Sequence, residues 1–148
     1  EAIAPFEPDA IGGMTLGADP IVGAVLAHCG NLGIDMAGFL VRKQPKGHGM
    51  KKCVEGPRPD KDPLRVAVLD DTFTTGGSTL AAAHRVQAEW GAEVIGAFCI
   101  VDREAGAAEN FAAEGIDARS LVTLNDLRPV NRYKNKSRRP ARLANGSV

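Results

Sequence analysis

The chain has 148 residues, of which 44% are hydrophobic and 24% are charged. This length suits one domain with a buried core, and this composition excludes a disordered chain. No apolar run approaches the about 20 residues of a membrane-spanning helix, and the first residues do not resemble a signal peptide. We therefore expect no association with a membrane.

The zero net charge hides an uneven distribution. Residues 128–148 contain seven basic residues and no acidic one, so the other 127 residues hold 11 basic against 18 acidic residues, a net charge of −7. We predict a domain over 1–127 and a basic C-terminal tail over 128–148. A solvated extension is the expected state of this tail. The alternative is an arm for an acidic surface or nucleic acid. Because Tyr133 is its one aromatic residue, base stacking has little support and we expect no nucleic acid partner.

The three cysteines, Cys29, Cys53 and Cys99, are odd in number and have neither CxxC nor metal-ligand spacing. This pattern indicates reduced thiols and favours the cytoplasm.

In the first part of the chain, predicted strands and helices alternate. "DAIGG" predicts a strand over 9–13, and "DPIVGAVLAHCG" predicts a helix over 19–30 with an early proline and a glycine at its end. A second apolar run covers 36–42. Residues 43–63 hold four prolines and three glycines, which predicts a long loop that could contain a short hairpin.

The alternation continues to residue 124. "RVAVL" (65–69) is an unbroken apolar strand of the kind buried in a parallel sheet. The following segments are an alanine-rich helix over 78–91 with Ser78 or Thr79 as its cap and Gly91 as its end, a strand over 93–102, a helix over 107–115 and a strand over 119–124. This order predicts a single-domain, Rossmann-like α/β fold with a mainly parallel sheet flanked by helices.

Three strand ends of the predicted sheet carry residues suited to chemistry, at 12–17, 70–79 and 102–103. Ligands of such sheets bind at the carboxyl ends of the strands. We therefore expect these three segments to form one site.

The richest of these segments is "DDTFTTGGST" (70–79). Its glycines permit close approach of backbone N–H groups to an anion, and its hydroxyls and the helix that follows add donors and a dipole. Walker A spacing is absent, so a phosphate monoester suits it better than a triphosphate. Asp70 and Asp71 can accept hydrogen bonds from sugar hydroxyls or anchor hydrated Mg²⁺. The segment thus predicts a ribose 5-phosphate site; the alternative is that the two acids only cap a turn.

This segment resembles the phosphoribosyl pyrophosphate (PRPP) signature of type I phosphoribosyltransferases. The resemblance implies that Asp70 and Asp71 contact the ribose hydroxyls. We expect both to be catalytic, by stabilising the positive charge that develops on the ribose as pyrophosphate departs. It also implies that residues 74–79 wrap the 5-phosphate: Thr74, Thr75, Gly76, Gly77, Ser78 and Thr79. We expect Thr72 and Phe73 to bind substrate as well.

A second segment, "FLVRKQPKGHGMKKCVEGP" (39–57), resembles the RKxxKxHG catalytic loop of orotate phosphoribosyltransferases. Arg42, Lys43, Lys46 and His48 concentrate positive charge, which suits a pyrophosphate leaving group. The alternative is a solvated basic loop. The resemblance implies that Lys46 and His48 are catalytic, that Arg42 and Lys43 bind substrate, and that the 43–57 loop of a homodimer reaches the neighbouring site.

Two further segments resemble the same family. "VDREAGAAENF" (101–111) matches the VDRxxGxxE segment, which implies that Arg103 holds orotate; the alternative is an ion pair of Arg103 with Asp102 or Glu104. "GGMTLGADP" (12–20) resembles the loop that receives pyrophosphate. This implies backbone contacts from Thr15, Leu16 and Gly17, although some relatives have lysine where Leu16 stands.

The resemblance spans about residues 9–127 in four ordered motifs. It implies Mg²⁺-dependent transfer of ribose 5-phosphate from PRPP to orotate, giving orotidine 5-monophosphate and pyrophosphate. We expect no direct side-chain ligand for the metal, with Asp70 and Asp71 acting through water. Family members usually have a further N-terminal segment, a hood over the base, which we expect this chain to lack. The alternatives are a transferase for another base and a non-catalytic PRPP- or nucleotide-binding regulator.

Overall fold

The computed structural model describes residues 2–44 and 52–127. The predicted catalytic residues Lys46 and His48 and the predicted tail over 128–148 lie outside the described residues. The elements, in chain order, are η1 (Ala4–Phe6), β1 (Ala10–Met14), α1 (Asp19–Asn31), β2 (Ala37–Val41), β3 (Val54–Glu55), β4 (Arg65–Phe73), α2 (Gly77–Trp90), β5 (Glu93–Asp102), α3 (Ala107–Ala113), β6 (Ala118–Thr123) and α4 (Leu124–Leu127).

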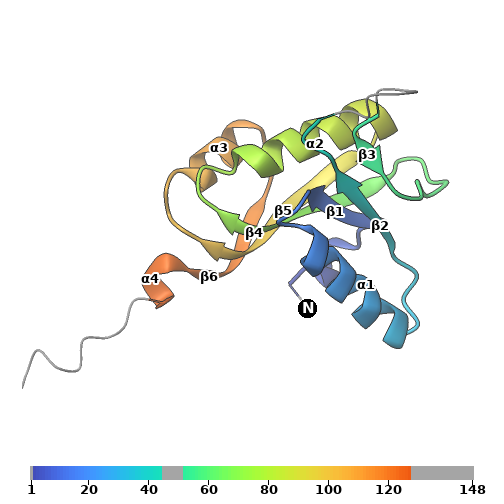
Figure 1. Ribbon diagram of the computed structural model, residues 1–148, viewed down its shortest axis with the longest axis horizontal. Helices are drawn as coiled ribbons and strands as arrows, with labels where there is room; N and C mark the ends of the chain where they lie inside the picture. The colour runs from blue at the N-terminus through green and yellow to red at the C-terminus, as the bar shows by residue number, and fades with distance from the viewer. Residues whose placement is uncertain (1, 45–51, 128–148) are drawn as a thin grey trace, which may run out of the picture.

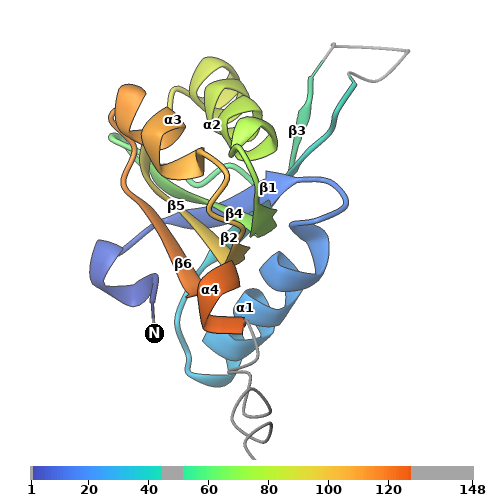
Figure 2. The same ribbon diagram turned by 90° about the vertical axis from the view of Figure 1, so that its left-hand side faces the viewer.

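The strands form one six-stranded sheet in the order β3-β2-β1-β4-β5-β6. Every pair is parallel except β2 and β3. Helix α1 lies on one face of the sheet, and α2 and α3 lie on the other (Figures 1 and 2). The predicted α/β fold is therefore confirmed. Within the described ranges, none of the helices combines the length and apolar character needed to cross a bilayer.

The central strands are apolar because both of their faces are covered. Val66, Val68 and Phe73 of β4 pack toward α2 and α3, in a core with Ala83 and Val86 of α2. Residues on the opposite face, such as Leu69, pack in a second core toward α1. Burial on both sides explains the unbroken apolar run in the sequence.

Most predicted elements are present, with informative shifts at their ends. Helix α1 continues past Gly30 to Asn31, and Gly33, at φ 69°, follows in the left-handed conformation that ends many helices. Of the segment 43–63, in which a short hairpin was predicted, Val54 and Glu55 form β3, whose antiparallel partner β2 precedes that segment. The short elements η1 and α4 have no counterpart in the prediction.

The largest difference concerns β4. The sequence interpretation took the chain out of the sheet after Leu69, but β4 continues to Phe73, with Asp70 opposite Cys99 and Phe73 opposite Asp102 of β5. An acidic residue can stay inside this strand because neighbouring groups donate hydrogen bonds to its carboxylate, as described below. Asp70 therefore belongs to the sheet.

Asp9 joins the beginnings of β1 and β4. Its Oδ2 accepts a hydrogen bond from the Arg65 amide at 2.9 Å, and its Oδ1 lies 3.0 Å from Lys61 Nζ. The pKa of Asp9 is lowered from its usual 3.8, mainly by the hydrogen bond from the Arg65 amide and to a smaller extent by the Lys61 ammonium. A lowered pKa in the folded state means that the ionised carboxylate stabilises the fold.

Asp9→Asn should lower the free energy of unfolding by about 1 kcal/mol at pH 7, because the ionised partner of Lys61 and Arg65 is lost. This contribution is present above the unfolded pKa and is lost as the pH falls through the lower folded pKa. Urea denaturation at pH 7 and at pH 3 measures it, with the exposed Glu93→Gln as control. Equal losses at both pH values would contradict the charge argument.

Candidate functional site

Three connections that follow parallel strands meet at one edge of the sheet: β1 to α1, β4 to α2 and β5 to α3. The first of them lies directly against the acidic residues. A Cβ on Gly17 would stand 2.8 Å from Oδ1 of Asp70 and 3.1 Å from Oδ1 of Asp71. The predicted pyrophosphate loop and the acid pair are therefore neighbours, and a side chain at Gly17 would displace the Asp70 carboxylate.

Asp70 is the organising residue of the β4–α2 connection. Its side chain is buried, and its Oδ2 accepts hydrogen bonds from the Ser78 and Thr79 hydroxyls, both at 2.8 Å. Its Oδ1 accepts one from the Asp71 amide at 2.9 Å. Hydrogen bonds to an ionised acceptor are stronger than neutral ones. The carboxylate thus ties the end of β4 to the first turn of α2.

Asp71 has a different environment. It is exposed, and it borders a hollow of about 590 Å³ whose lining also includes Leu16, Gly17 and Ile100. Its carboxylate is therefore available to a ligand at the strand ends, whereas that of Asp70 is engaged within the protein. The sequence pattern treats the two acids as one pair, but the structure gives them different environments.

The turn between β4 and α2 is shaped for an anion. Gly76 has φ 75° at the N-terminus of α2, a conformation that favours glycine. The Asn110 side-chain amide donates to the Thr75 carbonyl at 2.9 Å, and the Phe111 ring leaves no room for a Cβ on Gly76. Contacts from α3 thus hold the turn in place. Thr74, Thr75, Gly77 and Ser78 are exposed, at the positive end of a 14-residue helix dipole.

Three details of the predicted loop need correction. Phe73 is 2% exposed and its ring packs on Phe111 at 4.8 Å, so its side chain belongs to the core and not to a binding surface. Thr79 is fully buried and its hydroxyl donates to Asp70, so this side chain holds the loop on the end of β4. Helix α2 is capped by Gly76, with no side-chain cap, and not by Ser78 or Thr79. Ser78 and Thr79 lie inside the first turn of α2, which begins at Gly77, and their hydroxyls donate to Asp70.

Arg103 follows β5 at the same edge. Its amide donates to the Phe73 carbonyl at 2.9 Å, which places it beside the end of β4, and its side chain is exposed. Asp102 accepts the Glu104 amide, and Glu104 accepts two hydrogen bonds from Asn125. Among the described residues, neither acid pairs with Arg103. The exposed guanidinium lies at the edge of the sheet where the three connections meet.

The remaining predicted residues have distinct surroundings. Arg42 lies just after β2 and pairs with Glu55 at 3.4 Å, and Lys43 is exposed. Thr15 donates its amide to the Val41 carbonyl at 2.9 Å, and the Leu16 side chain is 81% exposed. Thr72 is half-buried near the end of β4.

Cys99 stands opposite Asp70 but is no nucleophile. Burial, with smaller effects from the nearby acids, raises the pKa of its thiol to about 11, so it stays protonated at neutral pH. All three cysteines are buried and free, in agreement with the expected reduced thiols. Within residues 2–44 and 52–127, no group of three or more His, Cys, Asp or Glu side chains could hold a metal ion.

Sequence reasoning missed the supporting residues of the site. Asn110 holds the Thr75 carbonyl from α3, and Arg85 and Glu89 of α2 contact the β2–β3 connection. No local motif marks them. The one signal in the sequence is that Arg85 and Glu89 are four residues apart, and so share a helix face.

Comparison with known proteins identifies the family. An orotate phosphoribosyltransferase of Aquifex aeolicus is 48% identical over 127 residues, which are 86% of this chain and 68% of the relative. The chain belongs to the orotate phosphoribosyltransferase family. No family model matches it. A second orotate phosphoribosyltransferase, from Rhodopirellula baltica, is 45% identical over 119 residues, which are 80% of this chain and 60% of the relative.

Solved structures of the family agree. Mycobacterium tuberculosis orotate phosphoribosyltransferase in complex with Fe(III) dicitrate matches with a TM-score of 0.73 and 42% identity, over 85% of this chain and 69% of that one. The same enzyme in complex with PRPP matches with a TM-score of 0.69 and 38% identity, over 84% of this chain and 68% of that one. The chain thus spans between 60% and 69% of the length of these family members.

Within this family site, Thr79→Val should lower the free energy of unfolding by about 1.5–3 kcal/mol, because the buried Asp70 carboxylate loses a donor that water cannot replace. Urea denaturation measures this loss. The control is Thr74→Val, which changes an exposed hydroxyl in the same turn and should have little effect. Equal stability of the two variants would contradict the role assigned to Asp70.

Proposed function

We propose that this chain transfers ribose 5-phosphate from PRPP to orotate, with release of pyrophosphate. The observation that carries the proposal is the contact of the Gly17 turn with Asp70 and Asp71, beside the anion-shaped turn at α2. A ligand with a phosphate at one end, a ribose diol in the middle and a pyrophosphate at the other matches this order of groups. Family relatives named orotate phosphoribosyltransferase support the same reaction.

The ribose 5-phosphate is assigned to the β4–α2 turn. Its phosphate oxygens accept hydrogen bonds from backbone amides and from the exposed hydroxyls of Thr74, Thr75 and Ser78. Asp71 accepts hydrogen bonds from the ribose hydroxyls. Asp70 contributes by holding the turn, since its own oxygens already have donors.

The reaction breaks the bond between C1 of the ribose and the pyrophosphate oxygen, and forms a bond from C1 to a ring nitrogen of orotate, whose proton is released to water. Positive charge develops on the ribose as pyrophosphate departs, and the carboxylate of Asp71 stabilises it. Arg103 presents a planar fork of donors to the carboxylate or carbonyls of orotate. The electron pair of the broken bond leaves with pyrophosphate, and the site has to neutralise the negative charge of this leaving group.

The pyrophosphate is assigned to the β1–α1 turn and to the basic connection after β2. Thr15, Leu16 and Gly17 offer backbone donors, and Arg42 and Lys43 offer positive charge. Lys46 and His48, in the same connection, are proposed to act on the leaving group, as their positions in the family motif imply.

Mg²⁺ fits this arrangement as a hydrated ion. Asp71 is exposed beside the hollow, so it would hold such an ion through water, while Asp70 is engaged by Ser78 and Thr79. The ion would neutralise charge on pyrophosphate and ribose oxygens.

We further propose a cytoplasmic homodimer in which the 43–57 loop reaches the neighbouring site, with residues 128–148 as a basic extension of the α/β domain.

An assay of base-dependent pyrophosphate release tests the function. The chain is incubated with PRPP, Mg²⁺ and one of orotate, uracil, hypoxanthine or adenine. Orotate should give the highest kcat/KM, because it alone among the four carries a carboxylate for Arg103. A preference for another base would refute the orotate assignment, and PRPP binding without turnover on any base would favour a regulator.

Asp71→Asn should lower kcat by about a hundredfold or more, because the developing positive charge loses its carboxylate. Thermal unfolding should stay near that of the unaltered chain, since Asp71 is exposed. The control is Glu93→Gln, which removes an exposed carboxylate at the start of β5, outside every motif of the site. Undiminished turnover of Asp71→Asn would contradict the role given to this residue.

A further inference from the structure

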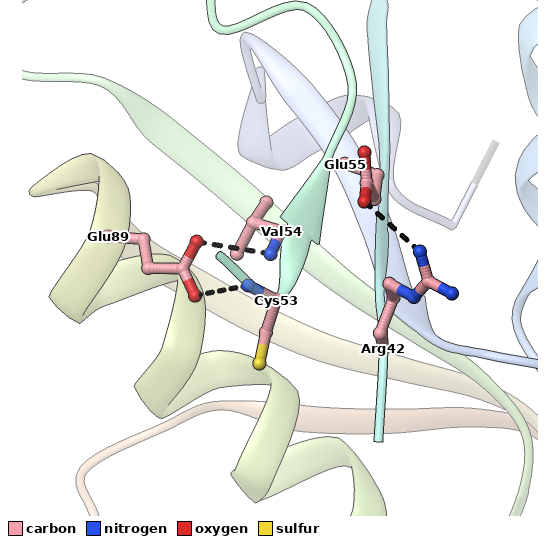
Figure 3. A network of polar contacts seen from close by, with 5 residues as sticks. All are labelled: Arg42, Cys53, Val54, Glu55 and Glu89. Atoms are coloured by element: carbon pink, nitrogen blue, oxygen red, sulfur yellow. Dashed lines mark hydrogen bonds and ion pairs between the residues drawn. The ribbon is translucent and has the colours of Figure 1, made fainter. Parts of the chain in front are cut away.

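Two side chains of α2 hold both ends of the connection between β2 and β3. Arg85 and Glu89 are four residues apart on this helix and therefore point the same way. Arg85 contacts the chain where it leaves β2, and Glu89 contacts the chain where it enters β3. Figure 3 shows Glu89 reaching from the helix to the start of β3.

Glu89 binds two consecutive backbone amides. Its Oε1 accepts a hydrogen bond from the Cys53 amide at 2.7 Å, and its Oε2 accepts one from the Val54 amide at 3.1 Å. Glu89 is itself exposed, but Cys53 and Val54 are only 7% and 6% exposed, so the two amides depend on the carboxylate more than on water. A carboxylate shared by two amides is a strong anchor for a backbone.

Arg85 binds two consecutive backbone carbonyls at the other end. Its Nη1 donates to the Arg42 carbonyl, and its Nη2 donates to the Lys43 carbonyl at 3.0 Å. The signs of charge match the groups: the cation meets carbonyl oxygens and the anion meets amide hydrogens. This complementarity distinguishes the pair from two unrelated surface contacts.

The short strand β3 needs such an anchor. It has only two residues in register with β2, Val54 opposite Val41 and Glu55 opposite Leu40. Its cross-strand ion pair, Arg42 with Glu55, is between side chains that are 46% and 40% exposed, and exposed pairs contribute little. The Arg42 amide also donates to the Cys53 carbonyl at 2.9 Å, and the contacts with α2 add a second anchor from outside the sheet.

Helix α2 also carries the anion turn. Gly77 and Ser78 begin the helix, and Arg85 lies about 10 Å further along its axis, with Glu89 at about 16 Å. One rigid helix thus contacts the phosphate turn at its first residues and the two ends of the β2–β3 connection further on. Arg42 and Lys43, which are assigned to pyrophosphate above, are the residues whose carbonyls Arg85 holds.

We propose that Arg85 and Glu89 are positioning residues of the transferase. They fix the backbone of Arg42, Lys43 and β3 on α2, and so set the distance of the basic connection from the phosphate turn. Because this inference rests on the proposed function, its test needs one measurement that is independent of turnover.

The test compares Glu89→Ala and Glu89→Gln with Gln87→Ala as matched control. Gln87 is exposed on the same helix. In Glu89→Ala, the Cys53 and Val54 amides should exchange faster with deuterium, and kcat should fall at least about tenfold through misplacement of the basic connection. Glu89→Gln keeps one acceptor oxygen, so its amide exchange rates and its kcat should lie between those of Glu89→Ala and the unaltered chain. In all three variants, the affinity for ribose 5-phosphate, which has no pyrophosphate and meets only the turn between β4 and α2, should be unchanged, and so should the exchange of the α2 amides.

Arg85→Met provides a second approach from the other end of the connection. It should also lower kcat, and its combination with Glu89→Ala should lose less than the product of the single effects, because both residues hold one connection. Independent, multiplicative effects would overturn the proposal. So would exchange rates at Cys53 and Val54 that match the unaltered chain, or faster exchange with unchanged kcat.

The two levels of failure are distinguishable. If the unaltered chain releases no pyrophosphate with any base, the proposed function is contradicted, and the positioning role in catalysis falls with it. The exchange rates still decide whether Glu89 holds β3. If the unaltered chain is active and Glu89→Ala is equally active, only the positioning role is wrong.

Discussion

The buried carboxylate of Asp70 is the constraint on which the candidate site depends. An ionised group in a central strand is unfavourable unless donors surround it, and here the donors come from Ser78, Thr79 and the Asp71 amide. Satisfying this one charge brings the first turn of α2 back over the end of β4. The same requirement leaves Asp71 as the acid that faces solvent. A single buried charge thus shapes the turn and separates the roles of two adjacent identical residues.

Much of the fold could be predicted because its signals are local. The apolar run of β4, the alanine-rich α2 and the end of that helix at Gly91 all follow from periodicity and helix-stop chemistry. The length of β4 could not, because an acid in a strand is plausible only once Ser78 and Thr79 are known to fold back on it. The burial of Phe73 and Thr79 depends on the same tertiary contacts, which a motif does not encode.

The candidate site shows the same division. The sequence placed three strand ends at one edge, and the contact of Gly17 with the acid pair agrees with that placement. The residues that support the site, Asn110, Arg85 and Glu89, were not predicted. Each acts on the backbone of a distant segment, and a backbone carbonyl or amide leaves no trace in the identity of its residue. Motifs therefore indicate which groups meet a ligand, and only the structure shows what holds those groups.

The Phe111 ring beneath Gly76 has a consequence for how the anion turn tolerates change. This ring packs on Phe73 of β4 and fills the space where a side chain at Gly76 would stand. Although the turn is at the surface, its floor is part of a close-packed interior, where even one methylene of altered volume is felt. The packing of the aromatic core therefore sets the shape of the turn. Substitutions of these aromatic residues would alter the anion turn even though every polar group in it stayed the same.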